Sequence, residues 1–492
     1  MKKTFFLGLS GLLLASAAPA QHWSLTWKKM QAVSPGLEQI GSLSAASSRE
    51  LANPRWSVGC ECLDREYADF SAYKPYVGEL GVGAARIQSG WARCEQKKGK
   101  YEFGWLDEAV DGLCEQGIRP WMCLAYGNPV YGAQKSLGSR IFTDEETLRA
   151  WERYVTAVAR RYKGRVSEWE VWNEPNLRGA DQSAAYAELL IRTAEAVRKV
   201  DPEAVIIGFG LSRMPLGFTG RVLDIVRERG KLDLIDYVSF HPYYENPDDA
   251  TPGIEALAEL VASYDPRIRL FSGESGCPAV LEWAHALRYH EWSEYSQAKW
   301  VARRLANDFA LGIRSSIFAI ADNQYPNMLQ SFGLLRTNLL KQVVYKRPSY
   351  YAMQHMVNLL HSGVKPAGRL AFTANTAREI ALVGLSQADR RDVLVLRPHS
   401  GRRTGLGPRR DERRGAFAGR PRARGRRHGP RLRPAAAPRQ PRRRPHETDR
   451  MPGVGRPDAA DRAQRRAVPR RSRRTQGRRN PSGYALLTQL FR

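Results

Sequence analysis

The sequence lacks any uninterrupted apolar run long enough to cross a membrane. The N-terminal run from Phe5 to Ala17 is shorter than the roughly 18–20 residues that a spanning helix needs, and no later segment reaches that length. It follows Lys2 and Lys3 and precedes an Ala-Pro-Ala site, which is the pattern of a cleavable secretory signal. We therefore expect residues 1–20 to be a signal peptide and the mature protein to be soluble, either secreted or periplasmic. A buried N-terminal helix is the alternative interpretation.

Cysteine is scarce, with 6 in 492 residues. No pair has the Cys-x-x-Cys spacing and no histidine lies at zinc-finger distance, which argues against a metal site. An exported chain meets an oxidising environment, so an even number of cysteines permits disulfides without assigning them. A chain of this length does not need such cross-links, so buried thiols are an equally good interpretation.

Acidic residues are nearly absent from the last part of the chain. Residues 397–492 contain 30 Arg and no Lys against 6 Asp and Glu, a net charge of +24. The preceding residues hold 47 of the 77 basic and 44 of the 50 acidic residues, which leaves only +3 of the total of +27. A basic surface is typical of nucleic-acid binders, but here the charge is confined to an appendage.

The same segment also lacks Ile, Lys, Trp and Cys and is dominated by Arg, Pro, Gly and Ala. These four residues have the most GC-rich codons, so the abrupt change is what an out-of-frame reading of a GC-rich gene would produce. A genuine basic arm for nucleic acid or anionic polysaccharide is the alternative. In either case this composition cannot bury a core, and we expect residues 397–492 to be disordered.

Between residues 51 and 362, short β-rich segments alternate with amphipathic helical ones, which is typical of a parallel sheet with crossover helices. Residues 148–162 show helical spacing of apolar side chains, preceded by a capping box at Thr143 to Glu146. No Gly-x-Gly-x-x-Gly follows the first strand, which disfavours the main rival, a doubly wound open sheet. The sequence therefore predicts an α/β fold, a (β/α)8 TIM barrel closed by a helix near residues 348–360.

Eight candidate strands support this prediction, at residues 56–61, 85–88, 120–124, 166–172, 205–209, 237–240, 269–272 and 315–321. Residues 21–50 form a lead-in to the barrel. Residues 363–396 contain further β-rich runs and open a small β-domain that remains incomplete.

Two glutamates stand where predicted strands end, Glu174 after the fourth strand and Glu274 after the seventh. The C-terminal ends of barrel strands converge on one site. Acid-assisted cleavage of a sugar–sugar bond needs two carboxylates, one to protonate the leaving oxygen and one to attack or to steer water. Strict alternation would direct Asn173 and Glu174 to opposite faces, but Pro175 breaks the strand and lets both reach the pocket.

The sequence around these carboxylates resembles clan A glycoside hydrolases. The tetrapeptide Trp172-Asn173-Glu174-Pro175 is similar to their acid/base motif, and residues 272–276 (SGESG) are similar to their nucleophile strand. Residues 100–107 (KYEFGWLD), 124–129 (LAYGNP) and 240–243 (FHPY) point, within that clan, towards glycoside hydrolase family 39 and its relatives. The resemblance covers roughly residues 50–360.

The resemblance implies a retaining mechanism with Glu174 as general acid/base and Glu274 as nucleophile. It implies that Arg86 and Tyr243 keep the nucleophile ionised and oriented, and an adjacent cation and a hydroxyl donor do favour a carboxylate on physical grounds. Tyr244 competes with Tyr243 for this role.

Further substrate contacts are expected around the same pocket. The resemblance implies that Asn173 hydrogen-bonds the sugar 2-hydroxyl, and His241 is expected to line the floor of the pocket. The other candidates for substrate binding are Tyr126, Asn128 and Trp172. Additional aromatic residues could stack on sugars, although most aromatic side chains fill cores or surfaces; these are Trp91, Trp169 and Tyr131.

Two features depart from the family pattern. Clan members commonly place an aromatic residue after the eighth strand, where residues 318–323 offer Ala321 and a polar pair. Family 39 enzymes usually carry a β-sandwich packed against the barrel, where this chain has an incomplete β-domain.

The function expected from the sequence is therefore a secreted retaining glycoside hydrolase that acts on a poly- or oligosaccharide. We expect no metal or organic cofactor, no nucleic-acid partner and no membrane span. A transglycosylase with the same residues and a non-catalytic polysaccharide-binding protein are the alternatives. Xylosides and bacterial exopolysaccharides both fit the resemblance. The sequence does not determine the linkage, endo or exo action, disulfide pairing or oligomeric state.

Overall fold

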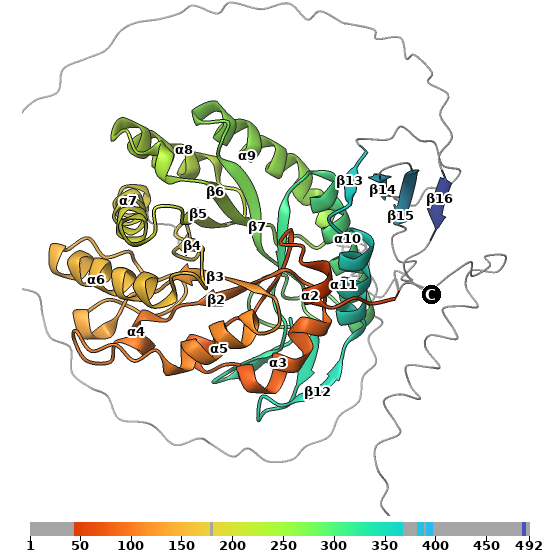
Figure 1. Cartoon of the computed structure of the whole chain (residues 1–492), viewed down its shortest axis with the longest axis horizontal. Helices are drawn as coiled ribbons and strands as arrows, with labels where there is room; N and C mark the ends of the chain where they lie inside the picture. Colours follow the sequence, from red (N-terminus) through yellow and green to blue (C-terminus); the bar gives the residue numbers. More distant parts are fainter. Residues whose placement is uncertain (1–43, 178–180, 368–380, 388–389, 397–484, 489–492) are drawn as a thin grey trace, which may run out of the picture. The chain divides into compact units, whose positions relative to one another are not determined.

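Eight parallel strands close into a barrel in chain order, which confirms the predicted (β/α)8 fold (Figure 1). The computed structural model describes residues 44–177, 181–367, 381–387, 390–396 and 485–488. The barrel strands are β1 (Trp56–Gly59), β2 (Ala84–Gln88), β3 (Arg119–Leu124), β4 (Glu168–Val171), β5 (Val205–Ser212), β6 (Tyr237–His241), β7 (Arg269–Ser275) and β8 (Arg314–Ile317).

Helices follow the strands and surround the barrel, as Figure 1 shows for α5 to α9. The α-helices are α2 (Ser48–Leu51), α3 (Phe70–Glu79), α4 (Trp91–Cys94), α5 (Gly104–Cys114), α6 (Glu145–Tyr162), α7 (Ser183–Val200), α8 (Leu216–Glu228), α9 (Thr251–Tyr264), α10 (Glu294–Ala310) and α11 (Pro348–Leu359). Short 3-10 helices are η1 (Leu63–Arg65), η2 (Pro129–Tyr131), η3 (Leu232–Leu234) and η4 (Pro247–Ala250).

Helix α6 illustrates how local sequence sets these elements. Its apolar residues repeat at helical spacing and are buried, so that one face packs on the barrel. The helix begins one residue later than the capping box predicted. Asp144 is the N-cap and accepts a hydrogen bond from the Thr147 backbone N–H at 2.8 Å, which satisfies one of the free N–H groups of the first turn.

The strand ends differ most from the sequence-based expectation at β5, β7 and β8. Strand β5 continues to Ser212, three residues beyond the predicted end. Strand β7 continues to Ser275, three residues beyond the predicted end, because its pairing with β8 shifts register between Ser272 and Ser275. Such an irregularity adds a residue and re-aims side chains. Strand β8 ends at Ile317 rather than at Ala321.

The barrel interior changes character along its axis. Towards the N-terminal ends of the strands it is filled by a cluster of large side chains that includes Trp121, Tyr237 and Phe271. Beyond this layer, towards the C-terminal ends, lies the buried guanidinium of Arg86 with its carboxylate partners. A charge is tolerated in such a place only when it is paired, so the polar layer marks a site.

The remaining strands lie outside the barrel. They are β9 (Asn323–Tyr325), β10 (Met328–Gln330), β11 (Leu335–Thr337), β12 (Val343–Lys346), β13 (Val364–Pro366), β14 (Ala381–Gln387), β15 (Arg390–Leu396) and β16 (Ala485–Thr488). Strands β9 with β10 and β11 with β12 form two antiparallel pairs, and β13 to β16 form one sheet in which β16 pairs parallel to β15.

The structure of this sheet bears on two of the predictions made from the sequence. Residues 363–396 do contribute three of its strands, as the β-rich runs indicated. We expected disorder from residue 397 onward, but the structure has a strand at Ala485–Thr488. This short segment, which contains no Arg, pairs parallel with β15. The signal peptide, most of the lead-in and the rest of the Arg-rich segment lie outside the described residues.

All six cysteines are unpaired thiols, five of them buried and Cys114 exposed, so the interpretation as buried hydrophobic side chains holds for five. Among the helices that the structure describes, none combines the length and the apolar character required to cross a membrane.

Candidate active site

The backbone after β4 turns sharply at the two residues that flank Asn173. Trp172 and Glu174 both adopt left-handed conformations, with φ of 68° and 52°. The Trp172 N–H still donates to Leu124 at the end of β3, whereas the Glu174 N–H donates to Gly210 in β5 at 2.8 Å. The strand thus breaks where Pro175 predicted, and the break directs both Asn173 and Glu174 towards the barrel axis.

Glu274 is the second-to-last residue of β7, and two hydrogen-bond donors hold its carboxylate. Arg86 Nη1 donates to its Oε2 at 2.7 Å, and the Tyr243 hydroxyl donates to its Oε1 at 2.7 Å. Burial by itself raises the pKa of this carboxyl, but His241, Arg86 and the Tyr243 hydrogen bond outweigh burial and lower it below its ordinary value. Glu274 is therefore ionised at neutral pH.

Arg86, on β2, is the centre of the buried charges and is itself fully buried. Besides Glu274, its guanidinium donates to Glu170 Oε2 at 2.9 Å and to Glu61 Oε1 at 3.1 Å. It also donates to the Asn173 Oδ1 at 2.7 Å. Three carboxylates therefore share one cation, which has a rigid planar set of donors suited to this arrangement.

Glu61 is the carboxylate that this sharing disfavours. Burial raises its pKa to about 7, against the opposing attraction of Arg86, and repulsion from Glu274 and Glu170 adds to the increase. Its Oε2 atom is buried without a hydrogen-bond partner among the described residues. Glu61 therefore takes up a proton more readily than Glu274 does.

His241 lies between the two predicted catalytic carboxylates. Its Nδ1 is 3.3 Å from Glu174 Oε1 and 3.9 Å from Glu274 Oε2, which keeps these oxygens within about 7 Å of each other. Burial opposes the charged imidazolium, but Glu274 and Glu174 together raise the pKa of His241 above its ordinary value. The histidine can thus carry part of the positive charge that balances the carboxylates.

The other predicted contacts divide into two groups. Tyr126 lies at the site, since its hydroxyl accepts a hydrogen bond from Asn173 Nδ2 at 2.9 Å. Tyr243, rather than Tyr244, contacts Glu274, because the ring of Tyr244 lies over Arg213 at 5.3 Å.

Asn128 and Trp172 are buried and contact other parts of the protein. Asn128 is buried, and its side chain caps η2 through Val130 and donates to the backbone oxygen of Glu95. Trp172 is 1 % exposed and packs edge-on against Tyr126 in an aromatic cluster. Their positions beside the motif serve to build the loop and the core beneath it, and contact of either residue with a sugar stays a prediction. Trp91 and Trp169 are likewise buried.

An aromatic residue does follow the eighth strand, one residue after its end. Phe318 lies next to Phe332, with ring centroids 5.7 Å apart, and Phe332 in turn packs edge-on against Tyr243. The apparent departure at Ala321 arose because the predicted strand was four residues too long. Glu61 and Glu170 were also missed; a glutamate within a β-rich run of apolar residues was the signal for Glu170.

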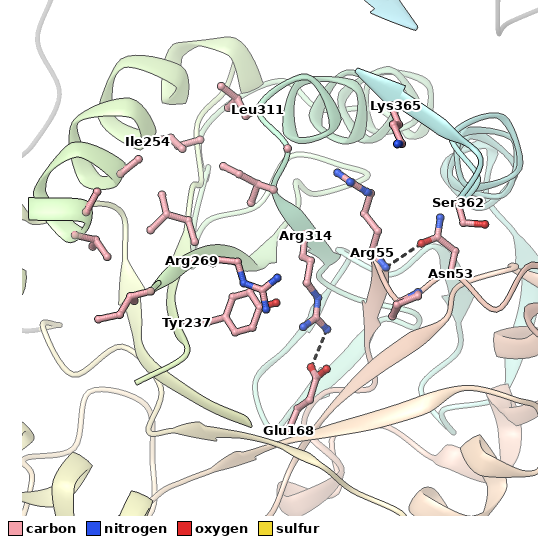
Figure 2. Close-up of a pocket in the computed structure, with 18 of the residues that line it drawn as sticks. Asn53, Arg55, Glu168, Tyr237, Ile254, Arg269, Leu311, Arg314, Ser362 and Lys365 are labelled. Atoms are coloured by element: carbon pink, nitrogen blue, oxygen red, sulfur yellow. Dashed lines mark hydrogen bonds and ion pairs between the residues drawn. The ribbon is translucent and has the colours of Figure 1, made fainter. Parts of the chain in front are cut away.

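Two hollows lie at opposite ends of the barrel. One, of about 410 Å³, is lined by residues after β1, β2 and β3, including Tyr67 and Tyr126, and so adjoins the carboxylates. The other, of about 870 Å³, lies at the N-terminal ends of the strands (Figure 2). Its lining is basic, and Figure 2 shows Arg314 paired with Glu168 there, at 2.7 Å. Because catalytic groups of such barrels lie at the C-terminal ends, the larger hollow is not the active site.

Within the described residues, no group of three or more His, Cys, Asp and Glu side chains is arranged to hold a metal ion. The expectation that the chain needs no cofactor stays a prediction.

Comparisons with known proteins agree with the fold and the motifs. The family model described as glycosyl hydrolases family 39 matches residues 85–268, which confirms the resemblance over a range that includes Arg86, Glu174, His241 and Tyr243 but not Glu274. A solved family 39 glycoside hydrolase from Bacteroides cellulosilyticus WH2 aligns with a TM-score of 0.55 at 21% identity, covering 70% of each chain. At that identity the likeness shows the fold.

Two curated proteins match shorter segments. A 6-phospho-beta-glucosidase of Dickeya chrysanthemi is 25% identical over 171 residues, which are 30% of this chain and 36% of that protein. Beta-galactosidase BgaH of Haloferax lucentense is 29% identical over 119 residues, 20% of this chain and 18% of that protein. The chain thus spans only about a third or less of the length of these relatives.

Proposed function

We propose that this chain is a retaining glycoside hydrolase that cleaves O-glycosidic bonds of a poly- or oligosaccharide. The observation that carries the proposal is that two neighbouring carboxylates have different hydrogen-bond partners. Glu274 receives hydrogen bonds from Arg86 and Tyr243 that keep it ionised, whereas among the described residues the side chain of Glu174 has one hydrogen-bond partner, the ring of His241. One carboxylate prepared to attack and one free to exchange a proton are what a double displacement requires.

In the first step, a Glu274 carboxylate oxygen forms a bond to the anomeric carbon of the sugar while the bond from that carbon to the leaving oxygen breaks. Glu174 gives its proton to the leaving oxygen, so the departing sugar leaves as an alcohol. Glu274 thereby loses the negative charge that Arg86 and Tyr243 stabilise, because its carboxylate becomes an ester.

In the second step, Glu174 acts as a base. It takes a proton from water as the water oxygen bonds to the anomeric carbon, and the ester bond to Glu274 breaks. Asn173, oriented between Arg86 and Tyr126, is placed to hydrogen-bond the sugar 2-hydroxyl during both steps. The retaining course is supported by the lowered pKa of Glu274, which leaves this carboxylate ionised and able to attack, and by the match to the family 39 model.

Substitution of the nucleophile tests the proposal most directly. Glu274→Gly should abolish hydrolysis of 4-nitrophenyl β-glycosides, tried as glucoside, galactoside and xyloside, and azide should restore turnover as a glycosyl azide of inverted configuration. Glu174→Gly is the matched variant: it should still react with these good leaving groups, and azide should there give the product of retained configuration. Full activity of Glu274→Gly without azide would discard the assignment.

We also propose that the protein is exported, which is supported by the basic start, short apolar run and Ala-Pro-Ala site of residues 1–20. Mass spectrometry of the protein from the periplasm or the medium should find a chain that begins at Gln21. Recovery of only uncleaved chain from the cytoplasm would contradict export.

A further inference from the structure

The loop between β7 and α10, residues 276–293, presents aromatic rings to solvent. Trp283 is 71 % exposed and Tyr289 is 65 % exposed, and their ring centroids lie 6.2 Å apart in an edge-on arrangement. Val280 and Leu281 beside them are also exposed. Large apolar side chains gathered on one exposed loop are unfavourable in water unless they serve to bind something.

The backbone that carries these rings is held in place from beneath. Glu282 is buried and accepts hydrogen bonds from the Ser331 hydroxyl at 2.7 Å and backbone N–H at 2.5 Å. The Tyr289 N–H donates to the Glu282 carbonyl at 2.9 Å, which closes the loop. The rings therefore project from a fixed base rather than from a loose segment.

The same loop contains three non-glycine residues in the left-handed conformation, His285, Leu287 and Tyr289, with φ of 68°, 57° and 63°. Each such residue costs free energy that the surrounding contacts must supply, and such residues gather at ligand clamps and active sites. Their concentration here indicates that the shape of the loop is retained for binding.

The inner side of the loop is connected to the nucleophile through packed side chains. Ala286 packs against the cluster of Phe318, Ala319 and Phe332. Phe332 lies edge-on against Tyr243 at 6.2 Å, and the hydroxyl of Tyr243 donates to Glu274. Packed side chains, Phe332 and then Tyr243, thus connect the loop to the nucleophile.

A row of rings continues from the loop to the hollow beside β1 to β3. His285 lies 4.8 Å from the ring of Tyr325, and Tyr325 lies 4.5 Å from the ring of Tyr67. Tyr67 lines the 410 Å³ hollow together with Tyr126, whose hydroxyl bonds to Asn173. Aromatic side chains therefore connect the loop to this hollow.

We propose that the 276–293 loop is a stacking platform for sugar units of a polysaccharide beyond the bond that is cleaved. This inference rests on the proposed function, since it names the substrate of that site as a polymer and the mode of cleavage as internal. The C–H faces of pyranose rings pack on flat aromatic rings, and the polar edges of the sugar stay in water. A row of rings that runs from the exposed loop to the hollow fits a sugar chain that lies along this face rather than a chain end held in a closed pocket.

The test compares one polymer with one short substrate. Trp283→Ala and Tyr289→Ala in the full chain should each raise the half-saturating concentration of a hydrolysed polysaccharide about 3- to 10-fold, as expected for loss of one stacking ring. Neither should change kcat/KM for the 4-nitrophenyl glycoside. Tyr351→Ala, which removes an exposed ring from α11, is the matched control and should change neither value. Products sized early in the reaction should be oligosaccharides rather than single sugars.

Other outcomes decide against the platform. Equal losses on both substrates would mean that the rings only support the loop, and unchanged values on the polymer would mean that they bind no sugar. If the parent chain hydrolyses neither substrate, the proposed function fails but the platform remains testable. Retardation in gels that contain the polysaccharide should then be reduced by Trp283→Ala and Tyr289→Ala, and retention equal to that of the parent would overturn the inference. Concentration-dependent self-association lost in the two variants, with no effect of polysaccharide, would assign the loop to a second copy instead.

Discussion

A single guanidinium, that of Arg86, faces three carboxylates, and this ratio sets the ionisation of the whole site. The pKa of Glu274 falls and that of Glu61 rises, although both share the same nitrogen, because Glu274 has Tyr243 and His241 as additional partners. The raised pKa of His241 follows from the same excess of negative charge. The residues act as one titrating unit in which each proton affects the others.

Removal of one donor from Glu274 should shift the pH profile. Tyr243→Phe deletes a hydrogen bond that lowers the pKa of Glu274, so the acid limb of kcat/KM should move to higher pH by about one unit, the worth of one hydrogen bond to a charged group. Tyr244→Phe, whose ring lies over Arg213, is the control and should leave the limb unchanged. If the acid limb stays in place in both variants, it does not report the ionisation of Glu274.

Glu61 should make stability depend on pH. Its pKa is about 7 in the folded protein against an ordinary value of 4.5, so the folded state binds more protons between these values and the free energy of unfolding falls as pH rises through that window. Glu61→Gln keeps the neutral form throughout. It should resemble the parent at pH 4.5 and exceed it by up to about 3 kcal/mol at pH 8, measured by urea unfolding.

The exposed neighbour Glu66 supplies the control for this comparison. Glu66→Gln should change stability by less than about 1 kcal/mol at either pH, as expected for a surface ion pair. A Glu61→Gln variant less stable than the parent at pH 8 would show that Glu61 is needed as a charge.

At the residue level, the sequence predicted what lies in local motifs. Glu174, Glu274, Arg86 and Tyr243 stand in or next to short patterns and come together as expected. Glu61 and Glu170 were not predicted, because their place in the site depends on pairing with Arg86, 25 and 84 residues away along the chain. Phe318 was missed for a different reason. An error in the predicted end of a strand shifts the expected position of every residue that follows it.

At the level of elements, helix starts offer a simple test of local energetics. Asp144→Ala removes the N-cap of α6 and should lower the free energy of unfolding by about 1 kcal/mol. Glu146→Ala, in the same turn and paired on the surface with Lys98, should lower it by less than about 0.5 kcal/mol. Equal effects would assign the loss to helix charge rather than to the cap.

The strands were predictable in number and order but not in length. The alternation of β-rich and helical segments is a local property, so all eight barrel strands were found. The break after β4 was signalled by Pro175. The register shift in β7 has no such signal, because it arises from the pairing of β7 with its neighbour β8 rather than from the local sequence of β7.

For the whole molecule, the concentration of positive charge in residues 397–492 predicts that binding to polyanions and catalysis depend on different parts of the chain. A chain that ends at Leu396 loses a net charge of +24 and should lose any salt-sensitive binding to nucleic acid shown by the full chain at low salt. Its kcat for glycoside hydrolysis should remain. Fluorescence anisotropy with labelled DNA over a range of salt concentrations gives the comparison. Equal affinity of the two chains would place nucleic-acid binding in the barrel.

The pairing of β15 with β16 has a consequence for synthesis of the protein. Residues 397–484 separate the two strands, so β16 leaves the ribosome only after all of them have been made. At the usual elongation rates this delay is roughly 5 to 20 s. During that time the outer edge of β15 has no strand to complete it, and an open strand edge is a template for pairing with other chains. Nascent protein should therefore be most vulnerable to aggregation late in translation, when the barrel is already complete.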